Sequence, residues 1–318
     1  MNKKLLICGA TGFIGRNLAE YFATKPDYDV YGTFFKSKPY DNPNIKFLKA
    51  DLTKNSDIIK IIKDKDIIIQ SAATTSGAKD IVSKPYIHVT DNAVMNALLF
   101  RAAFEHEIPH VVFLSCTIMY KSGDKPVKES DFNADEEIYP KYFGGAWTKI
   151  YNEKMCEFYS RIGKTKFTVI RHSNIYGPYD KYDLEKSHVF GATITKVMNA
   201  KNDGKIVVWG AGEEERDLLY VSDLVDFIDI AIKKQKNKFD LYNVGLGKTI
   251  SVSNLVKKIV DISDKKLKIE YDLSKPSIKT KLCLDISKAK KELDWEPKIS
   301  LDEGVKKTIN WFNNYFGK

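Results

Sequence analysis

Residues 4–15, KLLICGATGFIG, decide the fold. A short apolar run predicts a buried strand, and glycines follow it at positions 9, 12 and 15 before an amphipathic segment. Glycine there lets the chain turn, lets a pyrophosphate approach the backbone and lets a helix pack closely on the strand. The N–H groups of that helix would face the phosphates. We therefore expect a dinucleotide site that includes Gly9, Thr11, Gly12, Phe13, Ile14 and Gly15.

Apolar runs and longer amphipathic segments alternate through the first half of the chain. Strands are expected at 4–10, 29–35, 45–50, 66–73, 110–116 and 166–172, and helices at 13–25, 54–63, 85–106 and 146–163. The strand candidates are almost continuously apolar, which is typical of parallel strands buried on both faces. The pattern predicts an α/β fold, a doubly wound parallel sheet of the Rossmann type, with ligands outside the carboxyl ends of the strands.

The regular alternation of predicted strands and helices ends at about residue 173. Helices expected at 187–201 and 220–234 flank a short strand at 205–210. We expect residues 1–172 to form the dinucleotide-binding Rossmann domain. Residues 173–318 should form a smaller, mixed α/β domain for the substrate, with about residues 218–245 packing back on the first domain.

Composition excludes several classes of protein. The 318 residues are 43% hydrophobic, yet no apolar run approaches the roughly 20 residues of a membrane helix. The first apolar run is too short for a signal peptide, so we expect a cytoplasmic protein with no membrane partner. The net charge of +9 comes from scattered lysines, which argues against a nucleic-acid partner. Four widely separated cysteines match no metal-ligand spacing, so no metal is expected.

The end of the second strand indicates the cofactor. Lys36, Ser37 and Lys38 follow it, where an acidic residue would bind the ribose 2′-hydroxyl of NAD. Cations and a hydroxyl favour the 2′-phosphate of NADP, with NAD as the alternative. After the third strand, Asp51 and Leu52 could border the adenine, or Asp51 could begin a polar turn.

Over nearly its whole length the chain resembles the extended short-chain dehydrogenase/reductase family, the nucleotide-sugar epimerases, dehydratases and reductases. The phosphate loop (9–15), Ser115 after the fifth strand, Lys149 on a helix and RHSNIYGP (171–178) all resemble its motifs, as do 209–224 and 284–297. The resemblance implies that Lys149 positions the cofactor ribose and that Ser115 and Thr117 bind a keto or hydroxyl oxygen. It adds Ser71, Ala72, Ala73 and His172 to the cofactor site.

Within this family the chain resembles in particular the GDP-L-fucose synthase-like epimerase/reductases. This implies NADPH-dependent reduction of a GDP-4-keto-6-deoxy sugar, with or without epimerisation, by a homodimer. The stretch IYGPYDKYDLEKSHV (175–189) is similar to the segment with an epimerising histidine, which maps to His188. The resemblance assigns the nucleotide-sugar substrate to Asn174, His188, Val189, Lys196, Trp209 and Arg216.

The segment after Ser115 departs from that pattern. The subgroup has a cysteine two residues after the serine, as the base of epimerisation, whereas this chain has Thr117 there and Cys116 one position early. Because neighbouring side chains on a strand point to opposite faces, Cys116 is expected to face away from the substrate. Threonine is too weak an acid to act as a base unaided, so only His188 remains for epimerisation.

The catalytic helix departs from the pattern at Gly145. The family has a tyrosine there, one helical turn before the lysine, which passes a proton to the reacting oxygen. Tyr142 lies seven residues before Lys149, a helical rise of about 10 Å. Phe143 carries no proton, and Tyr120 is remote. Because general acid–base catalysis contributes about 10²–10⁴-fold, we expect this chain to bind ligands but to turn over poorly.

Dehydratases need acidic residues after the fifth strand, and SCTIMY (115–120) has none. The alternatives to reduction are a nucleotide-sugar 4-epimerase with tightly bound NAD(P), and a non-catalytic nucleotide-sugar or dinucleotide-binding protein. Beyond Gly145 the helix should be amphipathic, with Glu153 and Glu157 facing solvent.

Overall fold

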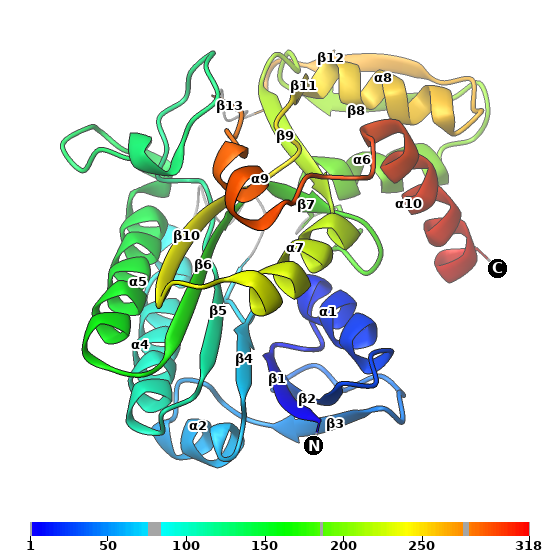
Figure 1. Cartoon of the computed structure of the whole chain (residues 1–318). Coiled ribbons are helices and arrows are strands. Elements are labelled where there is room, and N and C mark those ends of the chain that lie inside the picture. Colours follow the sequence, from blue (N-terminus) through cyan, green and yellow to red (C-terminus); the bar gives the residue numbers. More distant parts are fainter. Residues whose placement is uncertain (1, 76–83, 185–186, 276–279, 318) are drawn as a thin grey trace.

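A seven-stranded, wholly parallel sheet forms the centre of the computed structural model, which describes residues 2–75, 84–184, 187–275 and 280–317 (Figure 1). The strand order is β10-β6-β5-β4-β1-β2-β3. The strands are β1 (Lys3–Cys8), β2 (Tyr28–Phe34), β3 (Ile45–Lys49), β4 (Ile67–Gln70), β5 (His110–Leu114), β6 (Lys166–His172) and β10 (Phe239–Val244). Order and direction confirm the predicted doubly wound α/β fold.

Helices cover both faces of this sheet. One face packs against α1 (Phe13–Ala23), α7 (Val221–Lys234) and α9 (Ser287–Leu293) in a single apolar cluster. The other packs against α2 (Asn55–Ile62), α4 (Thr90–Glu105) and α5 (Phe143–Ile162). The central strands are therefore buried on both sides, which explains their continuous apolar sequence. In the part of the chain that the structure describes, no helix is long and apolar enough to span a membrane.

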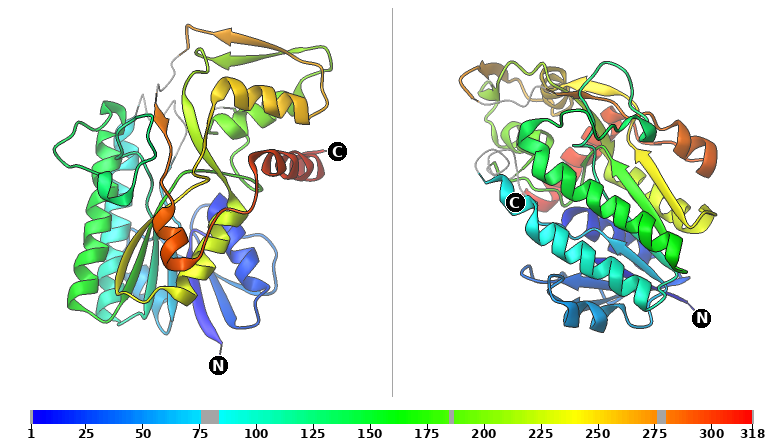
Figure 2. Two further views of the ribbon diagram at one scale, coloured as in Figure 1. Left: turned by 45° about the horizontal axis from the view of Figure 1, so that its top comes forward. Right: turned by 90° about the vertical axis from the view of Figure 1, so that its left-hand side faces the viewer.

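A smaller region lies over the edge at which the parallel strands end (Figures 1 and 2). Its four-stranded sheet contains β7 (Asn174–Tyr176), β9 (Glu215–Tyr220), β11 (Thr249–Ser251) and β13 (Lys281–Leu282), and β8 (Lys205–Trp209) pairs with β12 (Lys268–Asp272). The helices α6 (Val189–Asn199), α8 (Val252–Ile262) and α10 (Leu301–Phe316) share its apolar core. The later segments α7 and β10 return to the large sheet.

Two element ends differ from the prediction in ways that affect the site. β5 ends at Leu114, two residues early, and the chain then turns, with the Tyr120 N–H donating to the Thr117 carbonyl at 3.0 Å. The helix expected from residue 146 begins at Phe143, after a 3₁₀ turn at Pro140–Tyr142. Burial still alternates beyond β5, with Ser115 and Thr117 buried and Cys116 partly exposed.

Candidate active site

The phosphate loop joins β1 to α1 and has room only for glycine at two points. Gly9 has a φ of +78°, and a Cβ there would lie 2.8 Å from Cα of Ala72. A Cβ on Gly15 would lie 2.1 Å from the Gly9 carbonyl oxygen. Gly12 is the N-cap of α1 and is exposed, so the first N–H groups of the helix stay accessible. This close-packed, uncovered turn fits the pyrophosphate of a dinucleotide. Thr11, Phe13 and Ile14 are partly exposed around it.

The segment after β4 forms the other side of this turn. The Ser71 hydroxyl donates to the Cys8 carbonyl at 2.6 Å, and Ala72 and Ala73 follow it. Sequence reasoning missed Asn92 on α4, which is buried and accepts the Thr74 N–H at 2.9 Å while donating to the Thr74 carbonyl, also at 2.9 Å. Asn92 thus fixes the backbone beside the loop. No distinct signal marked it in the sequence, because α4 also carries Asp91, Asn96 and Arg101.

The residues expected at the adenosine end are divided between surface and core. Lys36, Ser37 and Lys38 are exposed just beyond β2. Asp51 accepts hydrogen bonds from the Thr53 hydroxyl at 2.7 Å and N–H at 3.1 Å. The hydroxyl bond is the main cause that lowers the pKa of Asp51, with a smaller effect from Lys36. Asp51 therefore begins a polar turn, and Leu52 is buried beneath it in the core.

Lys149 lies where β5 and β6 end. Its ammonium donates to the Leu114 carbonyl at 2.8 Å, and burial lowers its pKa. His172, at the end of β6, hydrogen-bonds through Nδ1 to the Ser173 carbonyl at 2.8 Å. Burial is the main cause that lowers the pKa of His172 to about 4, and the charge of Lys149 adds to it. This histidine is therefore neutral at pH 7, beside a cationic lysine.

Residues 115–117 alternate in burial, and the two residues expected to bind the reacting oxygen are the buried ones. Ser115 is 1% exposed and donates its proton to Glu153 at 2.5 Å, so that proton is not available to a substrate keto oxygen. Thr117 is also buried, whereas Cys116 and Ile118 are partly exposed. Burial raises the pKa of the Cys116 thiol, and the charge of Lys149 opposes the rise. The expected alternation therefore holds, with Cys116 on the opposite side from Ser115 and Thr117, and Lys149 is an electrostatic neighbour of its thiol.

Glu153 does not face solvent, which corrects a second expectation. Its carboxylate pairs with Arg171 of β6, with Nη2 to Oε2 at 2.6 Å and Nε to Oε1 at 3.0 Å, and both side chains are almost fully buried. Arg171 also donates to the Tyr120 hydroxyl at 2.9 Å, and Tyr120 donates to Asn243 at 2.8 Å. The Tyr120 hydroxyl therefore both donates and accepts a hydrogen bond within this network, and it cannot replace the missing tyrosine.

Gly145 lies within the first turn of α5. A Cβ there would lie 3.3 Å from Cδ1 of Ile118, so the end of the isoleucine side chain would have to shift slightly for a side chain at 145. The φ of Gly145 is not positive, so its backbone would accept any residue. The side chain of Ile118, and not the backbone conformation, is what limits substitution at this position.

The residues assigned to the substrate come from the small region. Lys196 of α6 donates to the Val207 carbonyl at 2.7 Å, and its ammonium lies 5.8 Å from the centre of the Trp209 ring. Arg216 donates to the Thr280 carbonyl at 2.7 Å. The exposed Asn174 donates to the Asp217 carbonyl at 3.2 Å, at the start of β7. Lys196 and Trp209 are thus brought together, as a cation beside an exposed aromatic surface.

His188 and Val189 mark the start of α6. His188 is its N-cap and is exposed at the molecular surface. Partial desolvation and the nearby cationic Lys181 lower its pKa. The imidazole is therefore neutral at pH 7 and able to accept a proton. Within the described residues, no three His, Cys, Asp or Glu side chains are placed to hold a metal ion.

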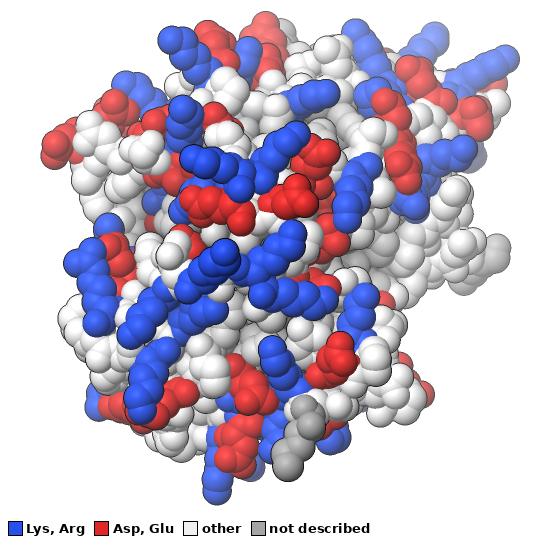
Figure 3. Space-filling view, viewed as in Figure 1, with Lys and Arg blue, Asp and Glu red and all other residues white. Residues whose placement is uncertain are grey.

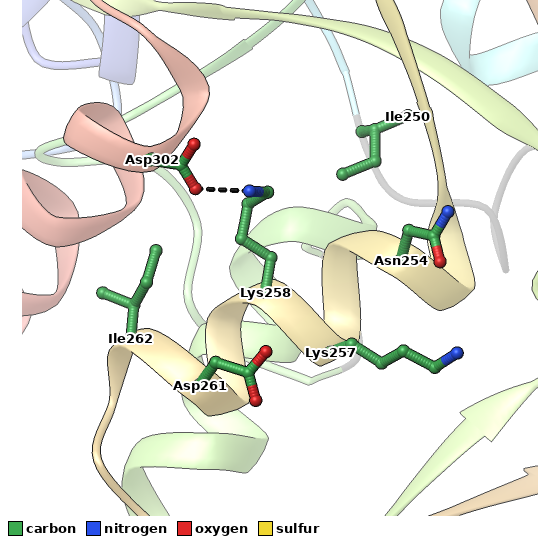
Figure 4. A pocket seen from close by; sticks show the side chains of 7 residues that line it. All are labelled: Ile250, Asn254, Lys257, Lys258, Asp261, Ile262 and Asp302. Carbon is green, nitrogen blue, oxygen red and sulfur yellow. Dashed lines mark hydrogen bonds and ion pairs between the residues drawn. The ribbon is translucent and has the colours of Figure 1, made fainter.

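A cavity of about 310 Å³ lies elsewhere, on the outer side of α8 (Figure 4). Its lining includes Lys257, and Lys258, which forms an ion pair with Asp302 of α10. None of the predicted site residues lines it, so it is separate from the candidate active site. On the face of the molecule in Figure 3, Lys and Arg side chains are spread widely, with Asp and Glu among them.

Comparison with known proteins identifies the family. The model of the NAD dependent epimerase/dehydratase family matches residues 5–245. GDP-L-colitose synthase of Yersinia pseudotuberculosis is 30% identical over 98% of both chains, and GDP-L-fucose synthase of Sinorhizobium fredii is 29% identical over 83% of this chain and 85% of its own. The UDP-glucose 4-epimerase of Thermotoga maritima, solved with UDP-glucose, superposes with a TM-score of 0.86 at 25% identity, covering 98% and 99% of the two chains. The chain therefore belongs to the NAD-dependent epimerase/dehydratase family.

Proposed function

We propose that the chain is an NADPH-dependent reductase of a GDP-4-keto-6-deoxy sugar, with or without epimerisation. The observation that carries the proposal is the position of Lys149, held by the Leu114 carbonyl where β5 ends. There a lysine can position a cofactor ribose and stabilise negative charge on a nearby oxygen. The GDP-sugar synthases among the relatives support a GDP-linked substrate.

The cofactor we propose is NADP. The phosphate loop fits a dinucleotide pyrophosphate, and the exposed Lys36 and Ser37 can bind a 2′-phosphate. When bound, the nicotinamide supplies the hydride. The chain's own residues orient the sugar: Lys196, Trp209 and Arg216 provide two cations and an aromatic surface for a nucleoside diphosphate. His188 is the proposed acid/base where epimerisation accompanies reduction.

A second candidate is a nucleotide-sugar 4-epimerase that keeps NAD(P) bound. The likeness to the UDP-glucose 4-epimerase favours it, since that match spans nearly the whole chain. Such an enzyme would interconvert two sugars without net use of NADPH. A non-catalytic binding protein is the third candidate, and only Gly145 favours it.

We further propose a homodimer formed through α4 and α5, which lie side by side on one flank of the molecule (Figure 2). Four exposed apolar side chains support this interface, and they are Val94 of α4 and Tyr151, Phe158 and Ile162 of α5. Residues 151, 158 and 162 share one helix face. Such a stripe is typical of a surface that packs against another protein surface.

One assay separates the candidates. NADPH oxidation is followed with a GDP-4-keto-6-deoxy sugar, and sugar interconversion is followed with UDP-glucose in the absence of added NADPH. Reduction predicts stoichiometric loss of NADPH in the first reaction and no product in the second. The opposite pattern would establish the epimerase. Substituting Lys36→Gln should raise KM for NADPH about tenfold and leave KM for NADH unchanged, with the exposed Lys60→Gln as control.

A further inference from the structure

The missing tyrosine raises the question of which group donates the proton. At Gly145 a hypothetical Cβ would lie 3.3 Å from Cδ1 of Ile118, so a side chain there would have to displace the end of the isoleucine. Ile118 packs against the apolar cluster of Met119, Ile138, Ala146 and Ile150. The chain itself has no acid at position 145. A donor has to reach the sugar from another position.

Tyr142 packs against that same cluster. It ends the 3₁₀ turn before α5, where its N–H donates to the Tyr139 carbonyl at 2.8 Å. The turn begins at Pro140, which restricts the backbone. The Tyr142 ring also packs against the Tyr139 ring, with a centroid separation of 5.5 Å. Its position is therefore fixed by packing on two sides.

The Tyr142 phenol differs from that of Tyr120 in its hydrogen bonds. Among the residues that the structure describes, none hydrogen-bonds its oxygen, whereas Tyr120 has two partners. The Tyr142 residue is partly exposed. The separation of Tyr142 and Lys149 along the helix axis describes the positions of their backbones. The tyrosine side chain extends well beyond its Cα. Distance along the helix therefore does not exclude this phenol.

The charged groups around Tyr142 belong to the site. Burial raises the pKa of its phenol and the guanidinium of Arg216 opposes that rise, while Tyr139 and Cys116 raise the pKa further. Cys116 is in turn an electrostatic neighbour of Lys149. Tyr142 thus shares an apolar cluster with Ile118, whose side chain lies against Gly145, and Arg216 and Cys116 are its electrostatic neighbours. A cation beside a phenol stabilises the phenolate that remains after proton transfer.

We propose that Tyr142 is the proton donor in the reduction, in place of the tyrosine that position 145 lacks; this rests on the proposed function. The Tyr142 O–H bond breaks as a new O–H bond forms on the carbonyl oxygen of the sugar. The carbonyl carbon receives its hydride from the reduced nicotinamide. The phenolate then regains a proton from water.

The test compares wild type with Tyr142→Phe, which removes one oxygen, and uses Tyr139→Phe as the matched control. We expect Tyr142→Phe to lower kcat about 10²–10⁴-fold and to leave the Kd values of NADPH and GDP-sugar unchanged. Urea unfolding of the variant checks that its fold is intact. In the wild-type protein, kcat should decrease at high pH as the phenol loses its proton. This decrease should be absent in Tyr142→Phe and present in Tyr139→Phe.

Three outcomes would overturn the assignment. If Tyr142→Phe keeps the wild-type kcat, the donor is another group, and a large loss in Cys116→Ala would identify the thiol. If Gly145→Tyr raises kcat about 100-fold, the site simply lacks its usual acid and Ile118 can move aside. If the wild-type protein is inert with both GDP-4-keto and UDP sugars, the proposed function is wrong as well. In the first two outcomes only the proton donor is wrong, and the proposed function stands.

Discussion

The Ser115 hydroxyl donates a 2.5 Å hydrogen bond to Glu153, and the same carboxylate forms a buried ion pair with Arg171. This contact joins the end of β5 to the helix that carries Lys149, one turn away from Glu153. Arg171 extends the network to Tyr120 and hence to Asn243 on β10. The groups beneath the site are therefore held by one continuous set of buried polar contacts, whose members can be tested singly.

Substituting Glu153→Gln should destabilise the protein strongly. The change leaves the Arg171 charge buried without its counter-ion, which typically costs about 3–5 kcal/mol. Urea unfolding of wild type and variant measures the difference. Glu157→Gln on the same helix is the control, because its ion pairs with Lys154 and Arg161 are at the surface and such pairs are worth about 1 kcal/mol or less. Equal losses in the two variants would mean that Glu153 is not paired in a dry interior.

Substituting Ser115→Ala should affect stability more than catalysis. The variant loses a hydrogen bond to a charged group, worth about 1.5–3 kcal/mol, while Glu153 keeps Arg171. Because Ser115 is covered, kcat and KM should stay close to wild type. Steady-state kinetics and urea unfolding are measured together, with the exposed Ser130→Ala as control. A 100-fold fall in kcat with normal stability would show instead that Ser115 binds the reacting oxygen.

Substituting Gly15→Ala should abolish cofactor binding. The new Cβ would lie 2.1 Å from the Gly9 carbonyl oxygen, so the loop has to move away from its phosphate-binding shape. Overpacking of this kind also costs about 1–3 kcal/mol of stability. Fluorescence titration with NADPH measures the binding. Gly123→Ala is the matched control, since a Cβ there meets no atom within 4 Å. Unchanged affinity in Gly15→Ala would exclude this loop as the dinucleotide site.

Acid should destabilise the fold through His110. This buried ring hydrogen-bonds Thr168 at 2.8 Å, and desolvation lowers its pKa to about 3. In the unfolded chain the ring takes up a proton near its ordinary pKa of about 6.5. The unfolded state therefore binds more protons between these values, and stability falls as pH falls through that window.

The loss from His110 should reach about 1.4 kcal/mol per pH unit within the window. Urea unfolding at pH 7, 6 and 5 should give a shallower slope for His110→Gln than for wild type. His106→Gln, at an exposed position, should keep the wild-type slope. His172, whose pKa is lowered to about 4, contributes in the same direction and remains in every variant. If the free energy of unfolding depends equally on pH in wild type and His110→Gln, His110 is not neutral and buried in the folded protein.

The fold could be predicted because its signals are local. The glycines at 12 and 15 reflect steric contacts with Gly9 within the same loop, and apolar runs indicate strands that are buried on both faces. Which side of residues 115–117 is buried could not be predicted in this way. It depends on where β5 stops, and the turn after Leu114 is set by contacts with α5 and β6 that no local pattern encodes.

Glu153 was misassigned for a related reason. A glutamate on an amphipathic helix normally faces water, and only a partner from another element reverses that preference. Arg171, within an apolar strand, was the available signal, because a buried cation requires a buried anion. Pairing the two from sequence would have required knowing that α5 lies against β6.

The proposed dimer provides the last prediction. Phe158 is 47% exposed in the middle of the apolar stripe on α5, with Tyr151 and Ile162 on either side. A stable interface buries about 800 Å² per partner, and a charge at its centre would have to be desolvated. Phe158→Glu should therefore shift a dimer to a monomer in sedimentation equilibrium. Tyr315→Glu, at a position 54% exposed on α10, is the control and should leave the mass unchanged. A wild-type chain that sediments as a monomer, or dissociation by Tyr315→Glu alone, would reject the α4–α5 interface.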